Sequence, residues 1–581
     1  MFKQLLVNEP WGTEREVVER YCSEAEKFGA TAVIVNRLPD NFHPGLIEDP
    51  TNLYPKFFNW GPSLDMFFST DLNREVWPEE LLTRNRKALL RTCEIARKHG
   101  LKPMLLLGEP RYQPERFFPK NPHLRGPRVD NPNTSSVAYF APCVSAPEVK
   151  EHYRELMTKM VRAIPDLDGM VFYNGDSGTG ICHSEGLYAG PNGSRFCEKI
   201  PPGRKLLNFL TLLLEASQAI QPDFKIWMYL YIHAKEREYV LEHSGGNISF
   251  VAAGSFVGGS SFEDPFATVK YHAEIDQVGY EKAFEERLHM MRESMEKARR
   301  MGKAELEECT LPVEQWMMPL RTVPYPFQVM QILDGLKSIE AKNVFFYGIF
   351  NDPAVVPFEA NRRILQLYRL HPDRSPEAIV RALAEEWATA GHAEALTEAW
   401  RLCDRAYRLR PIWAWGFGYQ RNFFPGPLVP DPFGLSVEER SYYYTEGEAN
   451  KDRIPGSDFR NALRHDETTR DWMLDRYESH AIHFTNEALG LQRKEMDRVK
   501  GNEARSCLIS QMRQIGAFAW WLRAQRNWLE AGRFFAPGTG QVKVARSMRE
   551  IMDDEIENTE SLKTLADGHV EELFSDSWNP V

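Results

Sequence analysis

Segments typical of β-strands alternate with segments typical of α-helices from residue 5 to residue 370, and this alternation constrains the fold more than any other feature. Eight short apolar or β-branched segments predict strands, and longer segments with helical periodicity separate most of them. The predicted strands are residues 5–8, 31–36, 102–107, 170–173, 225–232, 247–253, 310–316 and 344–350. The predicted helices are residues 13–29, 77–100, 147–163, 204–220, 280–301, 327–339 and 358–370, the first of them opening with a capping box at Thr13. This pattern predicts a closed (β/α)8 barrel with enlarged loops.

An open, doubly wound sheet is the main alternative, because it shows the same alternation of strands and helices. Such sheets normally carry a glycine-rich phosphate-binding turn after their first strand. Here the first predicted strand is followed by Asn-Glu-Pro-Trp-Gly at residues 8–12, which lacks that glycine pattern. The missing turn and the count of eight strands favour the barrel, although the segment 310–316 is the weakest of the eight.

The pattern changes after residue 375, where long amphipathic stretches replace the strands. These stretches are residues 376–409, 466–491, 502–531 and 542–573. They predict a helical domain over residues 373–581 that follows a barrel domain over residues 1–372. A chain of 581 residues, 43% of them hydrophobic, is long enough to bury both cores. The predicted fold class is therefore α/β, a (β/α)8 TIM barrel followed by an α-helical C-terminal domain.

The charge balance argues against two classes of partner. The chain has 71 basic and 82 acidic residues and a formal net charge of -11, which disfavours nucleic acid and anionic membranes. Its N-terminal segment lacks the apolar run of a secretory signal, and no stretch is long enough to cross a bilayer. We therefore expect a cytoplasmic protein, with a secreted mature form left open. The sequence does not decide whether the chain forms a homo-oligomer.

The eight cysteines show no spacing typical of a zinc site and no CxxC pair, so most are expected to be buried thiols. Cys182 and Cys197 follow the same predicted strand, which makes a disulfide conceivable. The reduced state is favoured for a chain without a secretory signal. A metal site from His183, Cys182 and Asp176 is disfavoured because these residues show no recognised ligand spacing. Neither a metal nor another cofactor is predicted.

Three carboxylates follow predicted strands, at the end where barrels place their chemistry. Asp176 lies in the segment Asn-Gly-Asp-Ser-Gly at residues 174–178, whose glycines allow close approach of a ligand. Glu109 follows the third strand and Glu9 follows the first. Each also has a structural interpretation: a turn or helix cap for Asp176, a salt bridge with Arg111 for Glu109, and a helix-dipole interaction for Glu9. All three are catalytic candidates, and Asp176 is the strongest.

A long loop after the third predicted strand, residues 110–142, is rich in arginine. Guanidinium groups bind carboxylates in a bidentate manner, so this loop is expected to hold an acidic sugar such as a uronic or sialic acid. The alternative is a solvated loop whose charges pair internally. Tyr231 and Trp316 lie near strand ends and are expected to stack on a sugar ring, although most aromatic residues in such strands belong to the core. The predicted substrate-binding residues are Asn8, Asn36, Arg111, His123, Arg125, Arg128, Asn174, His183, Tyr231, His233, Trp316 and Asn351.

Three segments carry a family likeness: residues 167–176, residues 109–111 and the C-terminal segment 554–559. With them the chain resembles the (β/α)8 glycoside hydrolases that carry a helical C-terminal domain, in the outline of α-glucuronidases, β-hexosaminidase-like enzymes and barrel sialidases. Ser177 follows Asp176 where β-hexosaminidases carry an adjacent second acid. The resemblance therefore does not imply their substrate-assisted mechanism.

Glycoside hydrolysis requires two carboxyl groups, one protonated and one ionised. The three candidates at the strand ends meet this requirement. We therefore predict an exo-acting glycoside hydrolase that removes a terminal sugar from a glycan, with an acidic sugar as one candidate substrate. Its expected partner is a carbohydrate. Two alternatives stay open: a metal-dependent isomerase or lyase of sugar acids, and a non-catalytic barrel that binds glycans.

Overall fold

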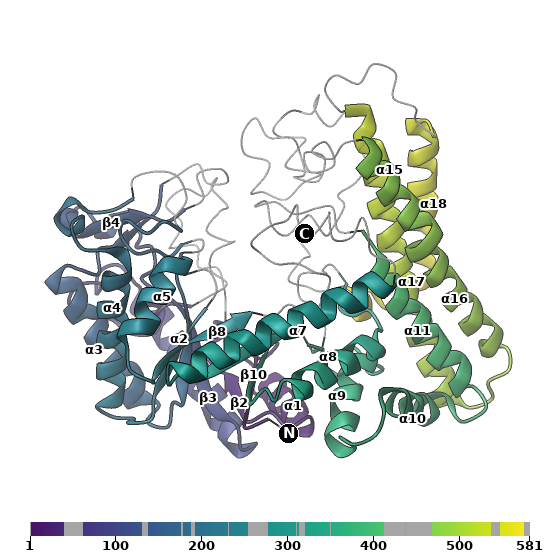
Figure 1. Ribbon diagram of the computed structural model, residues 1–581, viewed down its shortest axis with the longest axis horizontal. Coiled ribbons are helices and arrows are strands. Elements are labelled where there is room, and N and C mark those ends of the chain that lie inside the picture. The colour runs from purple at the N-terminus through teal and green to yellow at the C-terminus, as the bar shows by residue number, and fades with distance from the viewer. Residues whose placement is uncertain are drawn as a thin grey trace.

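The computed structural model describes residues 2–39, 62–130, 138–175, 178–186, 192–229, 232–253, 277–309, 311–312, 320–348, 350–411, 436, 467–535 and 546–574. Within these residues, eight parallel strands close into a barrel, with helices around it and further helices beside it (Figure 1). The strands follow one another around the barrel in chain order, and the last pairs with the first. They are β1 (Gln4–Val7), β2 (Ala32–Ile34), β3 (Lys102–Gly108), β6 (Gly169–Tyr173), β7 (Lys225–Met228), β8 (Ile248–Ala253), β9 (Glu305–Cys309) and β10 (Asn343–Phe346). The predicted barrel is confirmed.

The seventh barrel strand, β9, does not lie where the sequence placed it. The prediction that this strand spans residues 310–316 is wrong, because Glu305–Cys309 fills its place and pairs in parallel with both β8 and β10; most of the predicted segment lies outside the described residues. Three of its five residues are glutamates, a residue type that is depleted in strands. All five residues are nevertheless buried. The other seven predicted strands overlap observed ones.

Helices cover the outside of the barrel. They are α1 (Arg15–Lys27), α2 (Glu79–Lys98), α3 (Pro147–Ala163), α4 (Pro202–Gln218), α5 (Ala234–His243), α7 (Gln277–Arg300), α8 (Pro326–Ser338) and α9 (Ala360–Leu370). The sequence missed α5 and also an antiparallel pair of strands in the loop after β3, β4 (Arg125–Arg128) and β5 (Phe140–Pro142). The predicted capping box is wrong, because α1 is preceded by Glu14, which makes no side-chain capping hydrogen bond.

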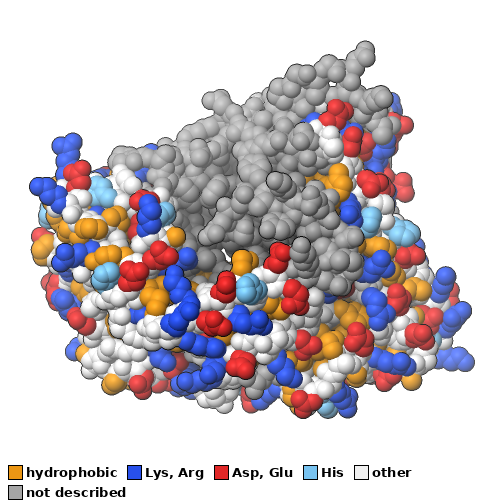
Figure 2. Space-filling model, in the orientation of Figure 1, with side chains coloured by type: hydrophobic (Ala, Val, Ile, Leu, Met, Phe, Trp, Pro, Cys, Tyr) orange, Lys and Arg blue, Asp and Glu red, His pale blue; other side chains and the backbone are white. Residues whose placement is uncertain are grey.

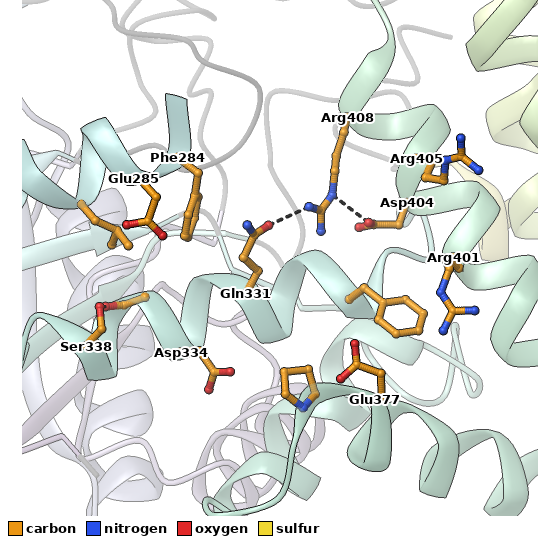
Figure 3. A pocket seen from close by; sticks show the side chains of 14 residues that line it. Phe284, Glu285, Gln331, Asp334, Ser338, Glu377, Arg401, Asp404, Arg405 and Arg408 are labelled. Atoms are coloured by element: carbon orange, nitrogen blue, oxygen red, sulfur yellow. Dashed lines mark hydrogen bonds and ion pairs between the residues drawn. The ribbon is translucent and has the colours of Figure 1, made fainter. Parts of the chain in front are cut away.

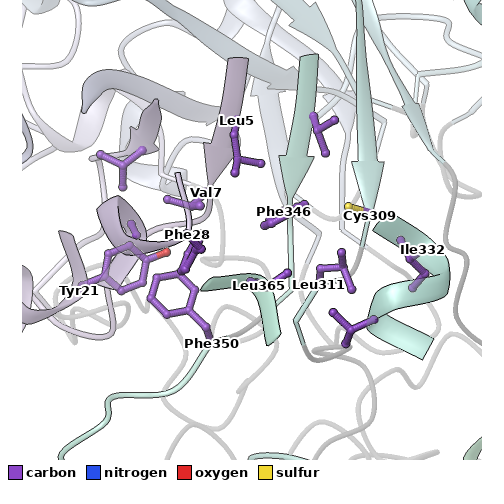
Figure 4. Packing of buried hydrophobic residues seen from close by; sticks show 14 of the residues in the cluster. Leu5, Val7, Tyr21, Phe28, Cys309, Leu311, Ile332, Phe346, Phe350 and Leu365 are labelled. Carbon is purple, nitrogen blue, oxygen red and sulfur yellow. The ribbon is translucent and has the colours of Figure 1, made fainter. Parts of the chain in front are cut away.

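Barrel side chains form two separate apolar clusters, because successive residues of a strand point to opposite faces. On β3, Leu106 belongs to the cluster inside the barrel, and Leu105 and Leu107 belong to the cluster between barrel and helices. Figure 4 shows part of the outer cluster, where strand residues such as Phe346 meet Phe28 beyond the end of α1. The inner cluster consists of Leu6, Ala32, Ile34, Met104, Leu106, Val171, Tyr173, Trp227, Tyr229, Val251, Leu306, Phe345 and Tyr347.

Gly108 ends β3 on the inner side of the barrel, where Tyr173 of β6 occupies the space that a side chain would need. A β-carbon at Gly108 would lie 2.2 Å from Oη of Tyr173. That hydroxyl accepts a hydrogen bond from Nη1 of Arg111 at 3.1 Å. A glycine is therefore required here for a tyrosine and an arginine to meet at the carboxyl end of the barrel.

The C-terminal part is helical, as predicted. Its helices are α10 (Pro376–Ala388), α11 (Ala393–Leu409), α15 (Glu467–Arg476), α16 (His483–Met496), α17 (Asn502–Ala531), α18 (Met548–Ala566) and α19 (Val570–Leu573), with a π-helical turn, η8 (Tyr477–Ile482), between α15 and α16. Both α10 and α11 contact α8 of the barrel. The predicted domain boundary at residue 372 falls between α9 and α10 and stays a prediction.

A pocket of about 660 Å³ lies where α7 and α8 meet α10 and α11 (Figure 3). Arg408 lies 2.7 Å from Asp404, and its Nη1 donates a hydrogen bond to Oε1 of Gln331 at 2.7 Å. Arg401 lies over the ring of Phe327, 4.8 Å from the ring centroid. The side chains that line this pocket come from helices or from positions next to them, so it is a polar seam between the barrel helices and the C-terminal helices.

Acidic and basic side chains are interspersed over the described part of the face that Figure 2 shows. The described part of this face therefore shows no large patch of a single charge sign. Among the described residues, no helix combines the length and the apolar character needed to span a bilayer.

Candidate active site at the carboxyl end of the barrel

Glu308 is a carboxylate that points into the barrel near its carboxyl end. It lies two residues after Leu306, which belongs to the inner cluster, so both side chains face the same side of β9. The residue is 7% exposed. Burial raises the pKa of its carboxyl to about 7, and a hydrogen bond with Tyr229 opposes this rise only in part. Glu308 therefore retains a proton near neutral pH.

Tyrosines form the inner wall beside Glu308. Tyr229 follows β7 and Tyr347 follows β10, and both belong to the inner cluster with Tyr173. The ring centroids of Tyr229 and Tyr347 are 5.9 Å apart. Within the described residues, Oε2 of Glu308 has no hydrogen-bond partner. One end of the barrel therefore holds a buried proton donor, a carboxyl oxygen without a hydrogen-bond partner among the described residues, and amphipathic aromatic rings.

Two predicted binding residues, Asn8 and Asn36, follow the first two barrel strands. Nδ2 of Asn8 donates a hydrogen bond to the carbonyl oxygen of Tyr347 at 3.2 Å, next to the tyrosine wall. Asn36 is completely buried and exchanges two hydrogen bonds with the backbone of Leu106, at 2.8 and 2.9 Å. Asn8 thus borders the candidate site, whereas Asn36 ties the segment after β2 to β3.

Glu9, a predicted catalytic residue, pairs with a neighbouring arginine. Its Oε1 lies 2.9 Å from Nη1 of Arg37, and 20% of its side chain is exposed. Burial raises the pKa of Glu9, and the positive charge of Arg37 opposes the rise. This pairing gives Glu9 a structural role at the end of β1, and its catalytic role stays a prediction.

Glu109 lies on the outer side of the barrel wall, which corrects the expectation that its side chain enters the active site. Oε1 accepts a hydrogen bond from the backbone N–H of Leu64 at 2.7 Å, and Oε2 accepts one from the hydroxyl of Tyr153 on α3 at 3.1 Å. The residue is 0% exposed. Burial, followed by repulsion from Asp65, raises the pKa of Glu109 to about 8. Strand alternation explains the placement, because Leu105 and Leu107 also face the helices.

A buried polar network continues from Glu109 on this outer side. Oδ1 of Asp65 lies 3.1 Å from Nε2 of His152, and Nδ1 of that histidine is 2.7 Å from Oγ1 of Thr70. Oδ2 of Asp65 accepts a hydrogen bond from Nε2 of Gln113 at 2.9 Å. The network joins α3 to the segment before α2, so its position indicates a structural function.

Arg111 and Asn174 hold the ends of β3 and β6 together. Arg111 is 1% exposed and donates a hydrogen bond to Tyr173 from inside the barrel end. Nδ2 of Asn174 donates to the carbonyl oxygen of Glu109 at 2.7 Å. Arg111 therefore contacts the inner wall and Asn174 fixes the backbone, and the predicted substrate-binding roles of both residues stay predictions.

The arginine-rich loop is paired internally. Arg125 forms an ion pair with Glu115, and Arg128 makes two hydrogen bonds with Asp130, at 2.8 and 2.7 Å. His123 has a side chain that is 63% exposed. These contacts match the structural interpretation of the loop, and the predicted substrate contacts of all three residues stay predictions.

The remaining described candidates stabilise loops. His233 lies 3.4 Å from Glu185, and Nε2 of His183 is 2.9 Å from the carbonyl oxygen of Ser194. Asn351 is buried and hydrogen-bonded to the backbone after β9. None of these contacts of the three residues involves Glu308, and their predicted binding roles stay predictions.

Asp176, Tyr231 and Trp316 lie outside the described residues. Asn174 and Gly175 are the last described residues before Asp176, and both follow β6 directly. The predicted roles of all three residues therefore stay predictions.

The sequence-based prediction did not include Glu308, although one signal could have found it. Predicted helices 77–100 and 147–163 are each followed within a few residues by an observed strand, at Lys102 and Gly169. The same spacing after the helix that ends at Arg300 predicts a strand near Glu305. A strand there places Leu306 and Glu308 on one face.

Comparisons with known proteins are informative about the fold. No protein-family model matches the chain, and no curated protein matches it in sequence. The chain is similar in structure to a GH138 enzyme targeting pectin rhamnogalacturonan II, with 9% identity and a TM-score of 0.50 over 98% of this chain and 62% of that one. It therefore spans about three fifths of that protein. At this identity the similarity shows the fold alone.

Two further solved structures have lower TM-scores. One is a GH115 4-O-methyl-α-glucuronidase with specificity for decorated arabinogalactans: 10% identity, a TM-score of 0.46, and coverage of 99% of this chain and 60% of that one. The other is a variant of an O-GlcNAc hydrolase from Thermobaculum terrenum: 9% identity, a TM-score of 0.40, and coverage of 98% of this chain and 90% of that one.

Proposed function

We propose that this chain is a glycoside hydrolase in which Glu308 protonates the leaving oxygen of the glycosidic bond. The observation that carries the proposal is a buried, protonated carboxyl inside the carboxyl end of a (β/α)8 barrel, where barrel enzymes place their catalytic groups. A glycosidic oxygen leaves readily only when it is protonated, and an acid with a pKa near the working pH is suited to that transfer. The fold shared with the GH138 enzyme that targets pectin rhamnogalacturonan II supports the class of substrate.

Asp176 is the ionised partner in this proposal. It follows β6, which two strands separate from β9 in the closed barrel, so both strands end at the same opening. A carboxylate that remains charged while Glu308 is protonated supplies the base or the nucleophile that hydrolysis needs. Tyr229 positions Glu308 through its hydrogen bond, and the ring of Tyr347 offers an apolar surface for the sugar.

An acidic, terminal sugar is the proposed substrate. Arg111 supports this choice, because its guanidinium group lies inside the barrel end beside Tyr173. A guanidinium group in a site with little water binds a carboxylate strongly. Arg125 and Arg128 do not support the choice, because their charges are already paired within the loop.

A screen of chromogenic glycosides tests the proposed function. The panel contains glucuronides, galacturonides, sialosides, N-acetylhexosaminides and neutral hexosides, each assayed with and without a chelator. Release from an acidic glycoside, unaffected by the chelator, is the expected result. Release from neutral glycosides alone would contradict the proposed role of Arg111 in binding an acidic sugar. Chelator-sensitive conversion of free sugar acids would favour the isomerase or lyase. Binding of glycans without any release would favour the non-catalytic barrel.

The pH dependence of hydrolysis follows from the pKa of Glu308. A general acid acts only while it is protonated, so kcat/KM should fall tenfold per pH unit as the pH rises above about 7. The measurement is kcat/KM from about pH 5 to about pH 9 on an alkyl glycoside of the sugar that the screen identifies. A profile that stays flat up to the upper limit would contradict the role of Glu308.

A further inference from the structure

Three cysteines from separate segments meet in one buried cluster. Cys143 lies between β5 and α3, Cys182 follows β6, and Cys197 ends the short helix η6 (Arg195–Cys197). Their sulfur atoms all lie within 4.8 Å of one another, and Sγ of Cys143 is 3.5 Å from Sγ of Cys197. The three residues are 0%, 1% and 0% exposed. Cysteines far apart in the chain have thus been gathered at one point.

The spacing of the sulfur atoms fits thiolates around a metal ion. Zinc–sulfur bonds of about 2.3 Å in a tetrahedron place neighbouring sulfur atoms about 3.8 Å apart. A disulfide joins only two sulfur atoms and would leave the third as a buried thiol. A soft divalent cation binds all three sulfur atoms, and thiolate ligands favour zinc among the common cations.

A buried lysine supplies the charge that such a site needs. Lys205 of α4 is 2% exposed, and its Nζ donates a hydrogen bond to the carbonyl oxygen of Cys182 at 2.7 Å and lies 4.0 Å from Sγ of Cys197. Lysine is almost never fully buried without an opposite charge. Three thiolates and one Zn²⁺ carry a net charge of one negative unit, which the ammonium group of Lys205 balances.

The backbone around Cys182 is adapted to the cluster. A β-carbon at Gly193 would lie 2.7 Å from Cβ of Cys182, so only glycine fits at this approach. The residue after Cys182 is His183, which has a φ of 64°, a left-handed conformation that is uncommon for residues other than glycine. The N–H of His183 donates a hydrogen bond to the carbonyl oxygen of Asn192 at 2.5 Å, which closes the loop behind the cysteine.

We propose that Cys143, Cys182 and Cys197 bind one zinc ion as thiolates, with Lys205 as the balancing charge. Binding displaces one proton from each thiol to solvent, and the fourth position of the tetrahedron is taken by a ligand from solvent. The ion would join the segment before α3 to the loop that follows β6 and to the start of α4. It would thereby fix the rim of the barrel next to the strand that leads to Asp176.

The full chain, purified without chelators and without a nickel resin, tests this proposal by inductively coupled plasma mass spectrometry. We expect about one zinc ion per chain. Cys143→Ser and Cys197→Ser should each abolish zinc binding, because three protein ligands become two. The matched control is Cys93→Ser, which alters a buried cysteine of α2 outside the cluster and should retain the metal.

Measurements on the unmodified chain keep the test decisive if a variant fails to fold. Replacement of the bound ion by Co²⁺ should produce the intense near-ultraviolet and visible absorption of a tetrahedral thiolate site. The proposal is overturned if zinc persists in both cluster variants, if the reduced chain contains no zinc and takes up no cobalt, or if the native chain contains a disulfide between Cys143 and Cys197.

Discussion

Replacement of Glu308 by glutamine is expected to lower kcat about 10²–10⁴-fold, the contribution typical of general acid catalysis. Glutamine has nearly the same volume and can still accept a hydrogen bond from Tyr229, so the barrel end should keep its packing. It cannot transfer a proton to the glycosidic oxygen. The measurement is steady-state turnover of an alkyl glycoside of the sugar that the screen identifies, together with the melting temperature of the variant.

Glu307→Gln is the matched control for this substitution. Glu307 precedes Glu308 on β9 and is also buried, but strand alternation places it on the outer face, toward the helices. Burial raises the pKa of its carboxyl well above the usual range, and glutamine keeps nearly the same volume without an ionisable group. Turnover should be close to that of the unmodified chain. Equal losses of turnover in the two variants would mean that a glutamine on β9 disturbs the fold, and the assignment of Glu308 would fail.

The second large effect concerns stability and arises from Glu109. Its pKa is raised from 4.5 to about 8 by burial and by Asp65, so folding favours the protonated form. The stabilisation from this group is complete below about pH 4.5 and is lost as the pH rises through about 8. A shift of this size corresponds to about 5 kcal/mol of unfolding free energy that is present at the acidic limit and absent at the alkaline one.

Glu109→Gln tests this effect because glutamine cannot ionise. Its Oε1 can accept from the N–H of Leu64, and its Nε2 can donate to the hydroxyl oxygen of Tyr153, so the two contacts of Glu109 can be preserved. Urea denaturation of both proteins from about pH 5 to about pH 9 gives the free energies of unfolding. The unmodified chain should lose about 4 kcal/mol more than the variant over this range. Parallel curves for the two proteins would show that Glu109 ionises without cost in the folded state.

The barrel was predictable because its evidence is local. Each strand such as β3 is a short apolar run between a helix end and a polar loop, and eight repeats of that unit leave few alternative folds. The strand β9 was not predicted in this way, because its three glutamates are typical of a solvated segment. Strand spacing places Leu306 and Glu308 on one face, and the tertiary structure shows that this face is the inner one and that both residues are buried.

The candidate site was predictable only in part, for a related reason. Proximity to a strand end indicates a catalytic position only where the side chain also points into the barrel, because the face on which a side chain points decides its neighbours. Glu109 follows Leu107 by two residues and therefore points to the same outer side of β3. This alternation could have been read from the sequence. The pairing of Arg125 with Glu115 is different, because it depends on how the loop folds. No local pattern shows whether a loop charge is paired or available to a ligand.

The effect of the leaving group on Glu308→Gln tests the central claim most directly. A glycoside with a dinitrophenolate leaving group needs no protonation, whereas a natural glycoside with an alkyl leaving group does. We predict that the variant keeps a kcat/KM on the dinitrophenyl glycoside close to that of the unmodified chain and loses most of its kcat/KM on the alkyl glycoside, because kcat/KM reports cleavage of the glycosidic bond whether Asp176 acts as base or as nucleophile. Equal losses on the two substrates would contradict the assignment of Glu308 as the general acid.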